Sequence, residues 1–300
     1  MYICKLMEMS ADKIAVLLFG TMGDIAETAG NALARSGYEA RAIPFPQNLL
    51  HDECGYRREL LKAVKTFHPD IILPVGNTVA ISRIKASVPG MPAIVAESPE
   101  KTELLDSKIS SSALAARLGI PQPRMYGDAE EPDHFPVIFK RDVSFAGSGV
   151  YRPTTIQALR RIREHFAGKP CLVEEYIDGE DWSVDAIRSE GYFRYGCYRS
   201  LENRGQGPSI VREVADNPIL GMYARTILDA VDWHGVCGMD FRVDRHGRPF
   251  FLECNPRLTG GLETQISAGF DIPSILVRLR TAPDERLDRV RPYLRKPERE

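Results

Sequence analysis

The stretch that decides the fold reads Cys237-Gly-Met-Asp240-Phe-Arg-Val243-Asp-Arg-His-Gly-Arg248-Pro-Phe-Phe-Leu-Glu253-Cys-Asn255-Pro-Arg257. Residues 237–243 and 249–254 are predicted to form two strands, and the glycine-containing segment between them a hairpin turn. Asp240 and Glu253 then fall on paired strands, and Asn255 shares the face of Glu253 by alternation. Two carboxylates and an amide oxygen are the hard ligands that Mg²⁺ prefers beside nucleotide phosphates. The stretch therefore predicts a magnesium–nucleotide site, and an acidic pair that only aids solubility is the weaker interpretation.

Residues just after this hairpin supply donors for an anion. The Arg257 guanidinium presents a fixed fork of N–H groups that suits a phosphoryl or carboxylate group. Thr259, Gly260 and Gly261 then leave the backbone open before a predicted helix, which is a natural anion site. We therefore expect Arg257, Thr259 and Gly260 to contact substrate.

A lysine and a glycine loop lie about a hundred residues upstream, in an order that suits phosphate. Lys140 ends the predicted strand 137–140, and the loop Ser144-Phe-Ala-Gly147-Ser148-Gly149 follows it. The ammonium group supplies charge, and the bare backbone lets N–H groups approach the phosphate oxygens. The order differs from the Walker pattern because the lysine precedes the glycines. Taken alone, Lys140 is equally well interpreted as a surface lysine and the loop as an ordinary turn.

The segment Glu174-Glu175-Tyr176-Ile177-Asp-Gly-Glu180 carries neighbouring carboxylates at the end of another predicted strand. Adjacent strand residues point to opposite faces, so at least one of the first two carboxylates faces the covered side. A buried carboxylate needs a donor, and an adenine amino group or ribose hydroxyls would serve. The alternative interpretation is that these carboxylates are solvated and form an acidic rim at the end of the strand.

The first third of the chain alternates apolar strands with amphipathic helices, beginning with Ile14-Ala-Val-Leu-Leu-Phe19. This alternation predicts βαβ units and a parallel sheet. Gly20-Thr-Met-Gly23 follows the first strand but lacks the full glycine spacing of a dinucleotide site. An NAD(P)-dependent dehydrogenase is therefore a disfavoured alternative.

Composition excludes several classes of protein. The 300 residues are 43% hydrophobic, which is enough for about two domains with ordinary cores. The 39 basic and 41 acidic residues give a net charge of −2, which argues against a polyanion-binding protein. No apolar run approaches the roughly 20 residues that cross a bilayer, the N-terminus lacks a signal-peptide pattern, and six scattered cysteines form no CxxC pair. We therefore expect a cytoplasmic protein with reduced thiols that binds neither nucleic acid nor membrane.

Taken in this order, the motifs resemble those of the ATP-grasp superfamily, in particular its carbamoyl-phosphate-synthase-like branch of carboxylate–amine ligases. The resemblance rests on Asp106-Ser-Lys108, Lys140 with its glycine loop, residues 174–177, Asp240, and residues 253–257. It implies a mixed α/β and α+β fold. A Rossmann-like pre-ATP-grasp domain would span residues 1–97 and an ATP-grasp domain residues 98–300, with a lid at about 123–174 that is mobile at 145–149.

The resemblance also implies roles for individual residues. Lys108 and Lys140 would hold the α- and β-phosphates, with the loop Gly147, Ser148 and Gly149 closing over the nucleotide. Glu174 would take the adenine amino group, the segment Glu175, Tyr176 and Ile177 would line the rest of the adenine edge through its backbone, and Glu180 would bind the ribose, with Asp181 as the alternative. Asp240, Glu253 and Asn255 would bind two Mg²⁺ ions, for which Mn²⁺ could substitute, and Arg257 would stabilise an acyl phosphate.

The implied function is activation of a carboxylate by ATP, followed by attack of an amine, with an amino acid as the expected substrate. The segment Arg199–Ser209 is expected to be a substrate loop in which Arg199 and Arg204 clamp a carboxylate together with Arg257, although a flexible polar loop without a ligand stays an alternative. A carboxylate–thiol ligase and a catalytically silent ATP-binding module are alternative functions. A homodimer is an expectation from the family only.

Overall fold

The computed structural model describes residues 13–44, 52–128, 130–144, 147–203 and 209–281. Its first part is a four-stranded parallel sheet with strand order β2-β1-β3-β4. β1 and β3 are buried along almost their whole length, which explains their continuous apolar sequences. The elements are β1 (Ala15–Gly20), α1 (Gly23–Arg35), β2 (Glu39–Pro44), α2 (Glu53–Phe67), β3 (Ile71–Pro74), α3 (Thr78–Ser87) and β4 (Ala93–Ile94).

The glycines after β1 have a packing role in this sheet. A Cβ atom on Gly20 would lie 1.9 Å from the carbonyl oxygen of Val75, so only glycine lets the two chain segments come this close. The Met22 N–H then donates to that same Val75 oxygen at 3.3 Å. The structure therefore explains Gly20 without a dinucleotide.

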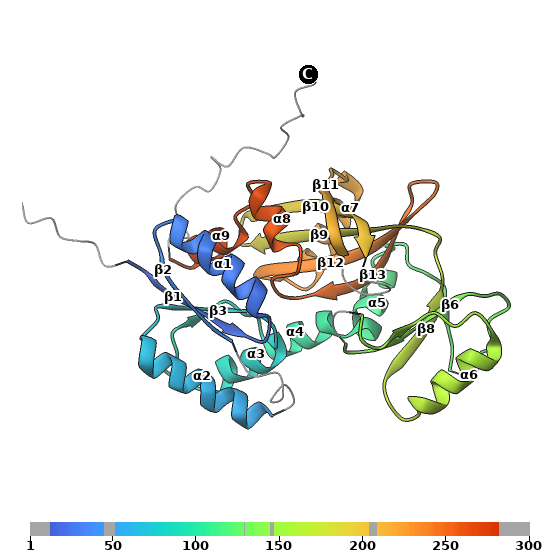
Figure 1. The fold of residues 1–300 in the computed structure, drawn as a ribbon, viewed down its shortest axis with the longest axis horizontal. Helices are drawn as coiled ribbons and strands as arrows, with labels where there is room; N and C mark the ends of the chain where they lie inside the picture. Colours follow the sequence, from blue (N-terminus) through green and yellow to red (C-terminus); the bar gives the residue numbers. More distant parts are fainter. Residues whose placement is uncertain (1–12, 45–51, 129, 145–146, 204–208, 282–300) are drawn as a thin grey trace, which may run out of the picture.

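Two capped helices lead away from the parallel sheet, as the sequence predicts. The Ser98 hydroxyl accepts from the backbone N–H of Lys101 at 3.4 Å at the start of α4 (Pro99–Asp106), with Pro99 in the first turn. The Ser107 hydroxyl accepts from the Ser110 N–H at 3.0 Å at the start of α5 (Lys108–Arg117). In Figure 1 these helices run beneath the largest sheet toward a smaller sheet on the other side.

The smaller sheet is antiparallel, with strand order β5-β8-β6-β7. One helix packs on it, and the core between them contains Phe139, Leu159, Phe166 and Val173. Its elements are β5 (Met125–Tyr126), β6 (Val137–Arg141), β7 (Val150–Tyr151), α6 (Ile156–His165) and β8 (Cys171–Glu175).

The largest sheet has five antiparallel strands in the order β11-β10-β9-β12-β13. Its strands are β9 (Gly179–Ser189), β10 (Tyr192–Asn203), β11 (Ser209–Val214), β12 (Gly235–Asp244) and β13 (Pro249–Asn255). Three helices accompany it, namely α7 (Pro218–Ala230), α8 (Leu262–Ser267) and α9 (Ile272–Thr281).

The two faces of this central sheet differ in chemistry. Directly opposed residues share a face, so Val184, opposite Met239, and Trp182, opposite Phe241, lie on one face, which packs against α4, α5 and α7. We call this the apolar face. Ser183, opposite Asp240, lies on the other, the polar face. The face that a strand residue occupies decides whether its side chain lies on the same side of the sheet as Asp240.

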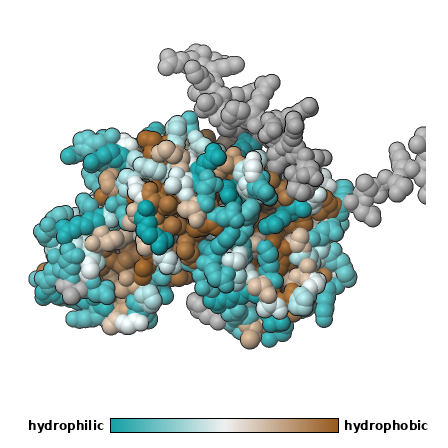
Figure 2. Space-filling view, turned by 180° about the vertical axis from the view of Figure 1, so that it is seen from behind, coloured by the Kyte–Doolittle hydropathy of each residue, from teal (hydrophilic) through white to brown (hydrophobic). Residues whose placement is uncertain are grey.

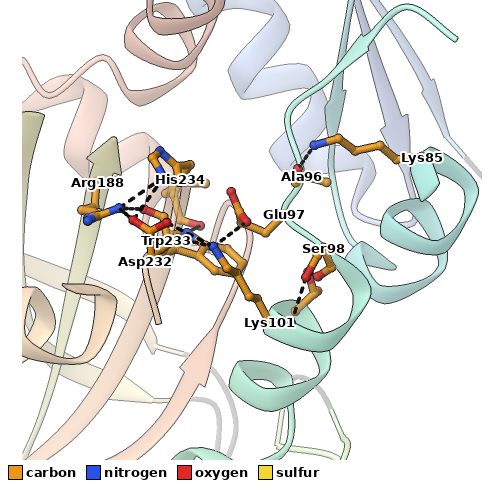
Figure 3. A network of polar contacts seen from close by, with 11 residues as sticks. Lys85, Ala96, Glu97, Ser98, Lys101, Arg188, Asp232, Trp233 and His234 are labelled. Carbon is orange, nitrogen blue, oxygen red and sulfur yellow. Dashed lines mark hydrogen bonds and ion pairs between the residues drawn. The ribbon is translucent and has the colours of Figure 1, made fainter. Parts of the chain in front are cut away.

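Charged residues fix the start of β12 against the segment before α4 (Figure 3). The Lys101 ammonium lies 3.2 Å from the Glu97 carboxylate and 3.6 Å from that of Asp232. Arg188 in β9 pairs with Asp232 at 2.6 Å and donates to the carbonyl of Trp233 at 2.9 Å. These contacts hold the helix that leads to Lys108 in a fixed position relative to the strand that carries Asp240.

Polar residues predominate at the edge of the face that Figure 2 shows. Viewed from behind, hydrophilic residues form most of the periphery, and hydrophobic residues show mainly between them (Figure 2). Among the described residues no helix is long and apolar enough to cross a membrane.

Candidate active site

An acidic pair stands at the centre of the polar face. Asp240 in β12 and Glu253 in β13 fall on paired strands, as predicted, and a register shift between Asp240 and Phe241 places them directly opposite each other. The Ser183 hydroxyl donates to Asp240 Oδ1 at 2.6 Å. The Asn255 amide donates to Asp240 Oδ2 at 3.2 Å and to Glu253 Oε1 at 3.3 Å. The structure thus brings together the two carboxylates and the amide that the sequence predicts as metal ligands.

The two carboxylates have opposite pKa shifts. Burial, followed by the negative charge of Glu253, raises the pKa of Asp240 to about 7. Burial also acts to raise the pKa of Glu253, but the positive charges of Lys108 and Lys140 outweigh it and hold that pKa below its usual value. Two like charges at such close range resist simultaneous ionisation, so a cation at this place would be strongly stabilised.

Lys108 connects the acidic pair to the smaller sheet. Its ammonium lies 3.0 Å from Glu253 Oε2, and the residue is only 4% exposed. The same ammonium donates to the carbonyl oxygens of Asp142 and Ser144 at 3.3 and 3.5 Å. The Asp142 carboxylate in turn accepts from the Ser107 hydroxyl and the Ile109 N–H, both at 2.9 Å. The N-terminus of α5 therefore holds the segment that follows β6.

Lys140 and Glu174 form a buried ion pair between β6 and β8. The Lys140 ammonium lies 2.5 Å from Glu174 Oε1, and the residues are 6% and 2% exposed. Burial raises the pKa of Glu174, although Lys140 opposes the shift. The second carboxylate oxygen, Oε2, is buried and has no hydrogen-bond partner within the described part of the chain. Buried acceptors normally have a hydrogen-bond partner. This oxygen can therefore still accept a hydrogen bond, for example from a ligand.

The glycine loop forms the turn between β6 and β7. Gly147 and Gly149 both have positive φ, +73° and +93°, which glycine adopts without strain. The Gly149 carbonyl accepts from the Arg141 N–H at 2.9 Å, and the Gly147 carbonyl accepts from the Val150 N–H at 3.2 Å. Phe145, at the tip of the predicted loop, lies outside the described residues.

The segment after Glu174 leads from β8 to β9. The Glu175 N–H donates to the Arg124 carbonyl at 2.9 Å, and the Ile177 carbonyl accepts from Arg242 Nε at 3.1 Å. The Arg152 guanidinium lies over the Tyr176 ring, 3.9 Å from its centroid. Tyr176 therefore joins this segment to the chain that follows β7.

The ribose assignment changes once the two faces are known. Glu180 and Trp182 are two residues apart in β9, so both lie on the apolar face. The Trp182 indole N–H donates to the Glu180 carboxylate at 3.2 Å. Asp181 lies opposite Arg242 on the polar face with Asp240, and it pairs with Arg242 and accepts from the Asn203 amide at 2.6 Å. Strand alternation thus turns Glu180, the residue predicted to bind the ribose, away from the acidic pair, and places the alternative, Asp181, on the same face as Asp240.

The predicted substrate loop is mostly strand. Arg199 lies within β10 opposite Trp182, on the apolar face, where it pairs with Glu213 at 2.6 Å and Glu180 at 3.5 Å. Arg199 therefore lies on the opposite face from Asp240 with its guanidinium paired to two carboxylates, and its contact with a substrate carboxylate stays a prediction. Arg204 lies outside the described residues. The β-branched residues Ile210 and Val211 favour a strand and could have indicated β11 from the sequence. The prediction of a loop before the helix at 218 did not take them into account.

Arg257, Thr259 and Gly260 follow β13 on a loop seated on the polar face, and of the three Arg257 contacts the group of residues around the acidic pair. Arg257 donates to Asn255 Oδ1 at 2.7 Å. The Thr259 hydroxyl donates to Asp185 at 2.8 Å, and Gln265 donates to the other Asp185 oxygen at 3.1 Å. Asp185 is 1% exposed, and burial raises its pKa. Sequence reasoning missed Asp185, whose partners are distant in the chain.

Glycine makes this seating possible. A Cβ atom on Gly238 would lie 2.2 Å from the Thr259 methyl group, and one on Gly261 would lie 2.3 Å from the Tyr198 ring. The loop therefore packs directly on the backbone of the sheet, which fixes Thr259 and Gly260 relative to Asp240.

Comparisons with known proteins show similarity in sequence and in fold. A family model described as "ATP-grasp in the biosynthetic pathway with Ter operon" matches residues 167–296. The carbamoyl phosphate synthase large chain of Thermoanaerobacter sp. (strain X514) is 24% identical over 238 residues, which are 72% of this chain and 22% of that relative. The chain thus spans about a fifth of the length of this relative.

Solved structures share the fold at low sequence identity. A biotin carboxylase from Campylobacter jejuni, in a complex with β-γ-ATP, is similar with a TM-score of 0.69 and 19% identity, over 88% of this chain and 70% of that one. An L-amino acid ligase from Bacillus licheniformis is similar with a TM-score of 0.67 and 15% identity, over 89% and 74% of the two chains. These similarities show a common fold.

Proposed function

The chain is a relative of the ATP-grasp carboxylate–amine ligases, and from this premise we propose that it uses ATP and Mg²⁺ to join a carboxylate to an amine. The observation that carries the proposal is the convergence of Asp240, Glu253 and Asn255 within reach of Lys108 and Arg257. A module that only binds nucleotide has little use for this whole set, so we favour an enzyme over a silent module.

The donor set fits magnesium. Within the described residues, no group of three or more histidine, cysteine, aspartate or glutamate side chains could hold a metal alone. Mg²⁺ at nucleotide sites characteristically uses one or two carboxylates and takes its remaining ligands from phosphates and water. Asp240, Glu253 and Asn255 would hold two such ions, or Mn²⁺ in their place. The ions would neutralise phosphate charge.

The nucleotide would lie between the polar face and the smaller sheet. Glu174 Oε2, buried without a donor, would accept from the adenine amino group, with residues 175–177 along the adenine edge. Asp181 would bind the ribose. The phosphates would be contacted by Lys108, Lys140 and the turn Gly147, Ser148 and Gly149. Each lysine would then interact both with its carboxylate partner, Glu253 or Glu174, and with ATP.

The chemistry needs no covalent nucleophile from the protein. A carboxylate oxygen of the substrate attacks the γ-phosphorus of ATP, the bond to the β-phosphate oxygen breaks, and ADP leaves. The amine nitrogen attacks the acyl carbon, phosphate departs with the C–O bonding pair, and the amine proton passes to phosphate or solvent. Arg257 would stabilise the acyl phosphate, and positioning and charge neutralisation provide the catalysis.

The proposal includes the domain organisation and the substrates. A Rossmann-like domain would comprise residues 1–97 and an ATP-grasp domain residues 98–300, with a lid at about 123–174 that closes over the triphosphate. The substrates would be a small carboxylate and an amine, with an amino acid among them. A thiol in place of the amine is the alternative acceptor, and a homodimer is the expected assembly.

The test is ATP turnover with defined acceptors. Wild-type protein with Mg·ATP and pooled L-amino acids should release ADP and phosphate in equal amounts, and Glu253→Gln should lose at least about a hundredfold of this rate while keeping its circular dichroism spectrum. Pooled thiols in place of amines separate the two acceptor classes. Unchanged ADP release in Glu253→Gln would contradict the site assignment.

A further inference from the structure

An arginine that the sequence analysis did not select lies on the polar face. Arg212 in β11 stands opposite Ser200 in β10, which shares the face of Tyr198 and hence of Ser183. Its guanidinium lies 5.8 Å from the centroid of the Tyr198 ring. One of its terminal nitrogens lies 3.5 Å from the position that a Cβ atom on Gly260 would take. Arg212 therefore faces the same loop that Arg257 flanks.

The bonding of Arg212 is incomplete. Its Nη2 donates to the Ser209 carbonyl at 2.5 Å, but its Nε is buried and has no hydrogen-bond partner among the residues that the structure describes. Within the same described residues, no carboxylate forms an ion pair with Arg212, whereas Arg199 and Arg242 both have one. A guanidinium stays charged at all accessible pH values, and a partly buried charge without a counter-ion is costly. An anion at this place would relieve that cost.

The nearest acid does not fill this role. Asp185 attracts Arg212 electrostatically, but both of its oxygens already accept hydrogen bonds from Thr259 and Gln265. These bonds commit Asp185 to holding the loop 259–261. Asp185 therefore leaves the Arg212 Nε–H without an acceptor among the described residues.

The strand order places Arg212 away from the phosphoryl-transfer centre. β11 is three strands from β12, which carries Asp240, and strands are spaced about 4.8 Å apart, so their backbones are roughly 14 Å apart. Arg257 contacts Asn255, which is bonded to the acidic pair, whereas Arg212 lies beside Gly260. The group that Arg212 binds is thus separate from the carboxylate that receives the phosphoryl group.

We infer that Arg212 binds a free carboxylate of the substrate, at the end remote from the reacting atoms, and that the amine component is therefore an amino acid. This inference rests on the proposed ligase function. The planar fork of N–H donors matches a carboxylate in two-point geometry, the Tyr198 ring supports the guanidinium from one side, and glycine at 260 leaves space above it.

The experiment compares two arginines of the same strand pair. Arg212→Gln is tested against Arg199→Gln, which removes an arginine from the opposite face. ADP release is measured with a constant pool of small carboxylates as phosphoryl acceptors, and with either L-amino acids or the corresponding amino-acid amides, which lack the free carboxylate, as the amine component. In wild type the acids should be the better substrates. Arg212→Gln should raise KM for the acids about 10- to 100-fold, the loss expected for a charged hydrogen bond, with KM for Mg·ATP unchanged. Arg212→Lys should recover part of the loss.

Two outcomes separate this inference from the proposed function. If wild type prefers acids and Arg199→Gln, rather than Arg212→Gln, raises their KM, the assignment of Arg212 is wrong. Amides that serve as well as acids in wild type also overturn it. If wild type releases no ADP with any pool, the proposed function fails. The carboxylate subsite is then judged by melting temperature: a rise on adding the amino-acid pool that is lost in Arg212→Gln and kept in Arg199→Gln supports it, and no rise in wild type overturns it.

Discussion

The Lys140–Glu174 pair allows a quantitative test of how the nucleotide pocket is built. Both side chains are almost fully buried and their charged atoms lie 2.5 Å apart. At an effective dielectric constant of about 20, this separation corresponds to an attraction of roughly 6–7 kcal/mol. Desolvation of both groups offsets part of it. Removing one partner, which leaves the other buried and uncompensated, is expected to cost about 3–5 kcal/mol.

The perturbation is Lys140→Met, which keeps an unbranched side chain up to the Cε position and removes the ammonium group with its charge. At about 2–4 °C per kcal/mol, the melting temperature should fall by roughly 6–20 °C. Lys140→Met/Glu174→Gln should recover most of this loss, because the amide leaves no unpaired charge.

The pH dependence follows from the direction of the Glu174 pKa shift. Burial raises this pKa in the wild-type protein despite Lys140, and removing the lysine should raise it further. The folded state then binds more protons than the unfolded state, so the free energy of unfolding falls as pH rises. Lys140→Met should therefore be more destabilised at about pH 8 than at about pH 5, while the double variant should lose this difference.

Thermal unfolding followed by circular dichroism, with all variants at both pH values, measures these effects. The reasoning is refuted if Lys140→Met and the double variant melt at the same temperature, because the cost would then not come from an uncompensated Glu174 charge.

Three further predictions concern the nucleotide. If the adenine edge lies along residues 172–177, ATP should support turnover at least about tenfold better than GTP, as expected for the loss of a buried hydrogen bond, and equal kcat/KM values would contradict that location. If Asp181 rather than Glu180 binds the ribose, Asp181→Ala should raise KM for ATP about tenfold while Glu180→Ala leaves it nearly unchanged, and steady-state kinetics showing the reverse order would restore the prediction made from sequence. If Gly147–Gly149 is the tip of a lid, its amides should exchange quickly without nucleotide and become protected with saturating Mg·ATP, and equal protection in both states by hydrogen-exchange mass spectrometry would remove the phosphate role of the loop.

Local patterns in the sequence were sufficient for much of the fold and for the centre of the site. The hairpin 237–254 was predicted correctly, with Asp240 and Glu253 on paired strands, because both strands and the turn are close in the chain. The direct opposition of the two carboxylates depends in addition on a register shift between Asp240 and Phe241, which the strand pattern does not show. The cap at Ser98 is local in the same way, since a capping side chain acts within three residues of its own helix.

Only the tertiary structure decided which residues share the site. Glu180 and Asp181 are adjacent, and the face that each occupies depends on the register of β9 against β12, which is set by the burial of Val184 and Ala186 beneath distant helices. Arg212 and Asp185 have the same dependence: each acquires its position through contacts with residues 259–265, tens of positions away in the chain. Alternation along a strand is a local property that the sequence displays. The assignment of its two faces to core and site is a collective result of packing, and one step of register reverses every side chain.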